Sequence, residues 1–279
     1  MIKRLIPITL TLAITTTVAA HEFWLSPIAW RVAPAGRATI LINVGDRFPD
    51  ATSFTAPDRV ESVRLVGPGG DMAISPPFRR EKNSLAADLQ APTTPGTYIG
   101  AVVIKTRFIE IKPPDFEKYL AHEGLDAIIA QRARAGESAK PGRERYSRYG
   151  KTLIRVGDAK TDAHATRPVR LKVELVPLSD PTTMKVGERC RLRLLFEGKP
   201  VAGAMVGAIY ASAKTQPDEW PLSARTDPQG EVEFTFEDSG PWLIRSVHMV
   251  RRAGERGTEA ADWESYWASL SFQLDPGGR

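Results

Sequence analysis

The sequence predicts a mainly β protein with two β-sandwich domains, Ig-like or transthyretin-like, joined by a helical insert. Short β-branched runs separated by Gly and Pro turns fill residues 28–112, helical spacing replaces them in residues 113–156, and short strands return from residue 169. Regular turns between short strands are typical of sandwiches. We therefore expect four segments: a signal peptide at 1–20, an N-terminal sandwich at 21–112, a helical insert and linker at 113–167, and a C-terminal transthyretin-like sandwich at 168–279.

The N-terminal sandwich is predicted from short apolar elements with turns between them. Residues 38–44 are apolar and β-branched, and Val60, Val63 and Leu65 are the apolar members of the next element. Gly67-Pro68-Gly69-Gly70 forms a turn. Another short element follows at 84–89, and residues 96–104 form the clearest strand of this half.

The helical insert is predicted from a change of period after Pro113-Pro114, which ends the preceding strand. Phe116, Tyr119, Leu120 and Glu123 follow helical spacing. The same spacing resumes over residues 144–154, which we also expect to be helical, and residues 158–167 form a polar linker.

The C-terminal sandwich is predicted from hairpin signals. The run 198–206 joins a short turn, Pro200 and small residues to a strand, which matches the hairpin entry of transthyretin-like domains. Asp227-Pro228-Gln229-Gly230 is a tight turn before an alternating strand. Further strands are expected at 240–248 and 265–274.

The first twenty residues have the pattern of a secretory signal. Lys3 and Arg4 precede a short apolar, Thr-rich core, and Val18-Ala19-Ala20 is a small-residue cleavage site. The core is too short and too rich in Thr for a membrane anchor, which needs about 20 mostly apolar residues. We expect a periplasmic mature chain that begins at His21 and has no membrane span.

Composition excludes several function classes. The formal net charge of +5 is mild and its basic residues are dispersed, so we expect no nucleic-acid partner. A single cysteine, Cys190, allows no internal disulfide and lies in an expected strand. The sequence has no Gly-rich phosphate loop, cysteine pair or Gly-x-Ser-x-Gly elbow.

His21 is the first candidate metal ligand. At a mature N-terminus, a histidine offers both its α-amine and its imidazole Nδ1 to one metal ion, and the amine loses its proton near pH ~8. The alternative is that cleavage falls a residue or two away and His21 is a solvated chain end.

A distant histidine and two carboxylates complete the expected metal site. His248 lies in an expected strand, and Asp262 and Glu264 follow the next loop, so these side chains could meet His21 at one end of a sandwich. Nitrogen and oxygen donors of this kind suit Ni, Co, Cu or Zn. The alternatives are that His248 is a histidine of the core and that Asp262 and Glu264 are solvated loop charges. His122 reads as a surface or capping residue and His164 as a solvated linker residue.

Several segments together resemble one family. They are His21-Glu22-Phe23-Trp24-Leu25-Ser26-Pro27, Leu120-Ala121-His122-Glu123-Gly124-Leu125, residues 143–153, residues 240–249 and Ala261-Asp262-Trp263-Glu264-Ser265-Tyr266-Trp267. The combination resembles the DUF4198 family, exported proteins often described as periplasmic components associated with cobalt or nickel uptake. The resemblance implies a metal-linked periplasmic binding protein with His21 and His248 as ligands and Asp262 and Glu264 as weaker additions.

Three functions compete at this point. The first is a periplasmic binding or delivery protein for Ni, Co or Cu that supports uptake, with the metal ion and a membrane metal transporter as partners. The second is a copper enzyme with a histidine brace, as in polysaccharide monooxygenases. The third is a structural or ligand-binding sandwich without metal. We favour the binding protein, and the sequence does not establish catalysis.

Overall fold

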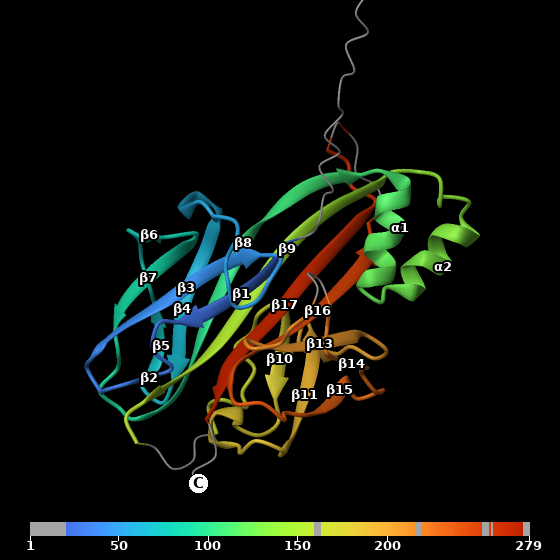
Figure 1. Cartoon of the computed structure of the whole chain (residues 1–279). Coiled ribbons are helices and arrows are strands. Elements are labelled where there is room, and N and C mark those ends of the chain that lie inside the picture. The colour runs from blue at the N-terminus through green and yellow to red at the C-terminus, as the bar shows by residue number, and fades with distance from the viewer. Residues whose placement is uncertain (1–20, 159–162, 216–218, 253–256, 258, 276–279) are drawn as a thin grey trace, which may run out of the picture.

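The computed structural model describes residues 21–158, 163–215, 219–252, 257 and 259–275, and confirms a mainly β fold with several sheets and two short helices (Figure 1). The expected signal peptide and part of the 158–167 linker lie outside the described residues. No helix in the described part of the chain is long and apolar enough to cross a membrane.

A nine-stranded sheet, here called the long sheet, runs through both halves of the molecule. Strand β17 pairs in parallel with β9, from Trp263 beside Glu144 to Ser271 beside Thr152, and so joins the N-terminal strands to the C-terminal ones. Its members, in spatial order, are β14 (Leu222–Arg225), β13 (Met205–Tyr210), β16 (Gly240–Arg251), β17 (Trp263–Leu274), β9 (Gly142–Val156), β8 (Gly96–Ile111), β4 (Val60–Gly67) and β5 (Gly70–Ala73), with β2 (Arg31–Val32) beside β9.

Two smaller sheets cover opposite faces of the long sheet. The N-terminal sheet consists of β1 (Glu22–Pro27), β3 (Arg37–Gly45), β7 (Ser84–Gln90) and β6 (Arg79–Glu81). The C-terminal sheet consists of β10 (Val173–Pro177), β11 (Arg189–Phe196), β12 (Lys199–Pro200) and β15 (Glu231–Thr235). Ile154 of β9 packs into the core under the N-terminal sheet, and its neighbour Leu153 packs into the core under the C-terminal sheet. Because successive side chains of a strand point to opposite faces, each small sheet forms a sandwich with its own face of the long sheet.

The expected helix over 144–154 is wrong, because these residues belong to strand β9. Both faces of β9 are covered, so its apolar residues need not alternate with polar ones. Tyr149, Leu153 and Ile154 therefore occur at intervals that also fit a helix, although they lie on a strand. Among the described residues, the helical insert consists of α1 (Pro113–His122) and α2 (Asp126–Arg134).

The helices cover one end of the long sheet, on the same face as β1. Phe116, Leu120 and Ile128 pack against Met249 and Trp263. Figure 1 shows the two helices beside the ends of β16 and β17. The approach is close at Gly142, where an added Cβ would lie 2.2 Å from the Phe116 Cγ atom. This packing holds the end of α1 beside the start of β1 and the middle of β16. Two single-turn 3-10 helices, Pro57–Arg59 and Pro181–Thr183, complete the secondary structure of the described residues.

Candidate functional site

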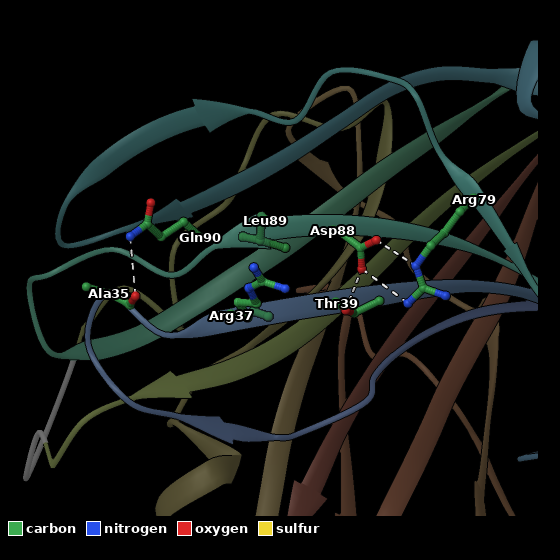
Figure 2. A pocket seen from close by; sticks show the side chains of 8 residues that line it. Ala35, Arg37, Thr39, Arg79, Asp88, Leu89 and Gln90 are labelled. Carbon is green, nitrogen blue, oxygen red and sulfur yellow. Dashed lines mark hydrogen bonds and ion pairs between the residues drawn. The ribbon is translucent and has the colours of Figure 1, made fainter.

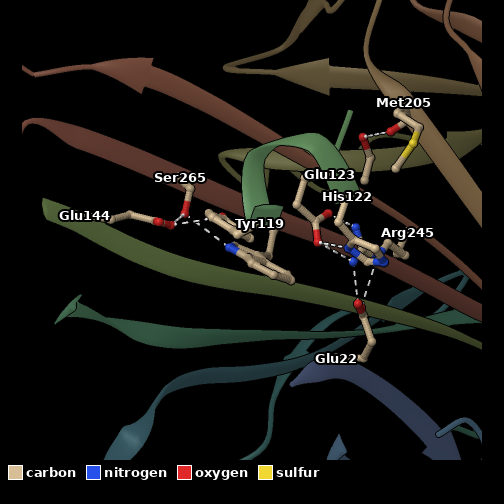
Figure 3. A network of polar contacts seen from close by, with 10 residues as sticks. Glu22, Tyr119, His122, Glu123, Glu144, Met205, Arg245 and Ser265 are labelled. Carbon is tan, nitrogen blue, oxygen red and sulfur yellow. Dashed lines mark hydrogen bonds and ion pairs between the residues drawn. The ribbon is translucent and has the colours of Figure 1, made fainter. Parts of the chain in front are cut away.

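A buried ionic cluster lies where β1, the end of α1 and β16 meet (Figure 3). The guanidinium of Arg245, on β16, binds the carboxylates of Glu22, at the start of β1, and Glu123, directly after α1. Nε donates to Glu22 Oε2 at 3.0 Å and Nη2 donates to Glu123 Oε1 at 2.8 Å. The three side chains are only 2–7% exposed, so one cation holds together three segments that are distant in the chain.

The local environment stabilises the charged forms of this cluster. Burial opposes the charge on Arg245, but the two carboxylates outweigh it and raise the pKa of the guanidinium above its usual value. Burial likewise opposes ionisation of Glu123, but the charge and hydrogen bonds of Arg245 lower the pKa of this carboxyl. The rings of Trp220 and Trp267 lie 4.6 and 5.4 Å from the guanidinium carbon, within the range of cation–π attraction.

Each carboxylate of the cluster directly follows a histidine. His122 Nδ1 lies 3.0 Å from Glu123 Oε1, and the His122 side chain is 35% exposed. His21 is 38% exposed, with Nε2 3.6 Å from Asp46 Oδ1, and its carbonyl accepts a 2.8 Å hydrogen bond from Arg148. The dipeptide His-Glu occurs twice, at 21–22 and 122–123, and Arg245 binds both glutamates. This repeated dipeptide is the sequence signal by which His122 could have been singled out.

A second buried carboxyl lies near the cluster. Glu144 on β9 accepts hydrogen bonds from the hydroxyls of Tyr119, at 3.2 Å, and Ser265. Burial raises the pKa of Glu144 to about 7, and within the described residues it forms no ion pair. The Tyr119 ring stacks on Trp267 with 6.0 Å between centroids, so this group connects α1 to the sheet beside the Arg245 cluster.

The structure does not bring His21 and His248 together. Arg245 and His248 are three residues apart on β16, so their side chains lie on opposite faces of the long sheet. Arg245 faces β1, whereas the half-buried His248 packs on Phe196 of the C-terminal sheet with 4.5 Å between ring centroids. Burial on that face lowers the pKa of His248. The expected convergence fails because the spacing of residues along a strand decides which face of the sheet each side chain occupies.

The two expected carboxylates lie apart from His21 as well. Glu264 is on the His248 face of β17 and forms an ion pair with Arg252. Asp262 contributes backbone hydrogen bonds to Arg143 and Arg252 at the start of that strand. Across the parts of the chain that the structure describes, no group of three or more His, Cys, Asp or Glu side chains is placed to hold a metal ion.

A separate hollow of about 740 Å³ lies on the exposed side of the N-terminal sheet (Figure 2). Its one carboxylate is already engaged, because Asp88 accepts hydrogen bonds from Arg79 and from Thr39, each at 2.6 Å, and Arg37 is the other charged side chain of the lining. We therefore take the Arg245 cluster, with its two histidines, as the candidate functional site.

Fold and site together define a class: a two-sandwich β protein in which a buried guanidinium ties the start of the first strand to a helical hairpin. The chain belongs to the DUF4198 family, since the model of this domain of unknown function matches residues 18–250. The family membership predicted from the sequence motifs is thereby confirmed. No curated protein matches the chain.

The solved structures that match the chain are remote from it in sequence and in superposition. An Escherichia coli alpha-2-macroglobulin activated by porcine elastase is 10% identical, with a TM-score of 0.24, over 92% of this chain and 20% of that one. The Yersinia pseudotuberculosis adhesin InvE is 11% identical, with a TM-score of 0.22, over 93% of this chain and 64% of that one. A DUF4785 family protein from Legionella pneumophila is 10% identical, with a TM-score of 0.25, over 79% of this chain and 51% of that one. Similarities this low carry no functional argument.

Proposed function

We propose that this chain is an exported, periplasmic transition-metal-binding protein that supports metal uptake or delivery through a mature N-terminal His21. The observation that carries the proposal is the pair of His-Glu dipeptides whose glutamates bind one buried guanidinium. Arg245 thereby joins Glu22 and Glu123, the residues next to His21 and His122, and the meeting of the two imidazoles on one ion is part of the proposal. In this proposal His122 takes the place that the sequence assigned to His248.

The surroundings of His21 suit chelation by a terminal residue. Its Nε2 is directed at Asp46, whose Oδ1 atom is buried and lacks a hydrogen bond within the described residues. A proton on Nε2 leaves the lone pair on Nδ1, the ring nitrogen nearer the residue's own backbone nitrogen. Cleavage after Ala20 makes that backbone nitrogen a basic amine, so amine and Nδ1 can bind one ion. A carboxylate that accepts a hydrogen bond from the second ring nitrogen is a common support for metal-binding histidines, and Asp46 lies near that position.

The surroundings of His122 follow the same logic. In the tautomer with hydrogen on Nδ1, Glu123 accepts that hydrogen and Nε2 keeps the lone pair for a metal. Glu123 is in turn held by Arg245. One amine and two imidazoles suit Ni, Co, Cu and Zn alike. The family resemblance favours Ni and Co among these, with a membrane metal transporter as the recipient.

Calorimetric titration of the mature protein with Ni²⁺, Co²⁺, Cu²⁺ and Zn²⁺ tests the proposal, after mass spectrometry has established the first residue. We expect His21→Ala and His122→Ala each to weaken binding of the preferred ion by at least about tenfold. His248→Ala is the matched control and should leave the affinity unchanged. A chain that retains Ala20 keeps every side chain but displaces the terminal amine, and it should lose the chelate.

The proposal would be overturned if the His21 and His122 variants bound the ion with the affinity of the wild type. A mature chain that starts at another residue would overturn it as well. If none of the four ions bound, the hypothesis of a structural or ligand-binding sandwich without metal would be favoured over metal binding. Copper-dependent oxidation of ascorbate by the wild type, lost in His21→Ala, would instead favour the histidine-brace enzyme.

A further inference from the structure

The C-terminal sandwich has two strand edges on the same side. Strand β14 ends the long sheet and pairs with β13, and β15 lies at the margin of the C-terminal sheet and pairs with β11. Among the described residues neither strand has a second partner. The two edges lie close together in the same part of the molecule (Figure 1). Unpaired backbone groups on such edges are able to pair with another extended chain.

A hollow of about 490 Å³ lies between these edges. Its floor contains Phe234 and Trp242, which are buried in the sandwich core, and its walls include the half-buried Tyr210, Leu222 and Ala224. An apolar floor between two strand edges can accept a side chain from an added strand.

The rim of the hollow is acidic. Glu233, Glu237 and Asp238 line it, and Glu233 already pairs with Arg189 at 3.2 Å. Glu237 and Asp238 have no ion pair within the described residues. The whole chain is net positive at +5, so this negative rim is a local feature. Charge complementarity favours a cationic partner.

We propose that this edge, here called the β14–β15 edge, binds an extended basic segment of a partner protein. The segment adds a strand to β14 or β15, inserts an apolar side chain over Phe234 and Trp242, and places Lys or Arg beside Glu237 and Asp238. Strand addition of this kind takes affinity from backbone hydrogen bonds and specificity from alternate side chains. A second copy of this chain is disfavoured, because a two-fold contact would set each acidic rim against itself. None of the residues of the proposed metal site take part.

The probe is a fluorescent peptide of about seven residues that alternates Lys and Val, the length of an ordinary strand. Fluorescence anisotropy measures its binding to the mature chain at low salt. We expect saturable binding that Glu237→Gln with Asp238→Asn weakens by at least about fivefold. The matched control is Asp58→Asn with Glu61→Gln, an exposed acidic pair in the other half of the molecule, which should bind the peptide as the wild type does.

Two further peptides separate strand addition from charge attraction. A peptide methylated on alternate backbone nitrogens keeps its charge but cannot pair as a strand, and we expect at least about tenfold weaker binding. A Glu-Val peptide should not bind. Hydrogen exchange should show new protection in β14 or β15 with the Lys-Val peptide.

The proposal is overturned if the Lys-Val peptide does not bind, or if the methylated peptide binds as tightly as the unmethylated one. It is also overturned if the control variant loses as much affinity for the Lys-Val peptide as the Glu237 and Asp238 variant does. It is also overturned if sedimentation shows the chain dimerising through this edge, which would identify a second copy as the occupant.

Discussion

Replacing Arg245 by Met tests whether the buried cluster holds the N-terminal strand to the helical hairpin. Met replaces the apolar stem of Arg but is shorter and carries no charge, so Glu22 and Glu123 remain without a cation in a site where they are 7% and 2% exposed. Breaking a buried ion pair from one side costs about 3–5 kcal/mol, because the remaining charge is left without a partner. Here two carboxylates lose the same cation, so we expect a loss at the upper end of that range.

Urea unfolding followed by tryptophan fluorescence measures this loss, and Trp220 and Trp267 report on the site directly because they contact the guanidinium. The matched control is Arg189→Met, which breaks an ion pair whose arginine is 73% exposed and should cost about 0–1 kcal/mol. For a chain of this size, the Arg245 variant should also melt roughly 10 °C lower.

A loss in Arg245→Met no larger than in Arg189→Met would refute the reasoning, since it would mean that the cluster is solvated. A loss of the expected size without faster hydrogen exchange in α1 and β1 would refute the specific claim that Arg245 joins these two elements.

Two further predictions concern the surroundings of the cluster. Burial raises the pKa of Glu144 from 4.5 to about 7, so the folded state binds this proton more tightly and stability falls by roughly 3 kcal/mol as pH rises across that interval. Glu144→Gln should flatten this part of the stability curve, and urea midpoints at pH 5 and pH 8 that still differ as in the wild type would contradict it. Gly142→Ala places a methyl group against the Phe116 ring and should cost about 1–3 kcal/mol, with faster hydrogen exchange in α1. Gly142 does not have a positive φ, so this loss would come from contact with Phe116 and not from backbone strain, and a loss below about 1 kcal/mol would contradict the prediction.

The local sequence pattern predicted the secondary structure correctly where a single signal was strong. The strand expected at 96–104 lies within β8, and the helix expected after Pro113-Pro114 is α1. The pattern gave the wrong prediction at β9, because a strand covered on both faces need not alternate apolar and polar residues. Distant segments of the chain decide which faces of a strand are covered.

The sequence by itself determined the mainly β class, the family, and which histidines and carboxylates the chain contains. Only the tertiary structure decided which of these meet. Arg245 binds Glu22 across 223 residues and Glu123 across 122, and no local pattern encodes such separations. Likewise, His248 lies on the other face of the sheet because it is an odd number of residues from Arg245 in an extended strand. The chemistry of each side chain can therefore be predicted from the sequence. Which side chains lie close together depends on how the strands pair and on which face of the sheet each residue occupies.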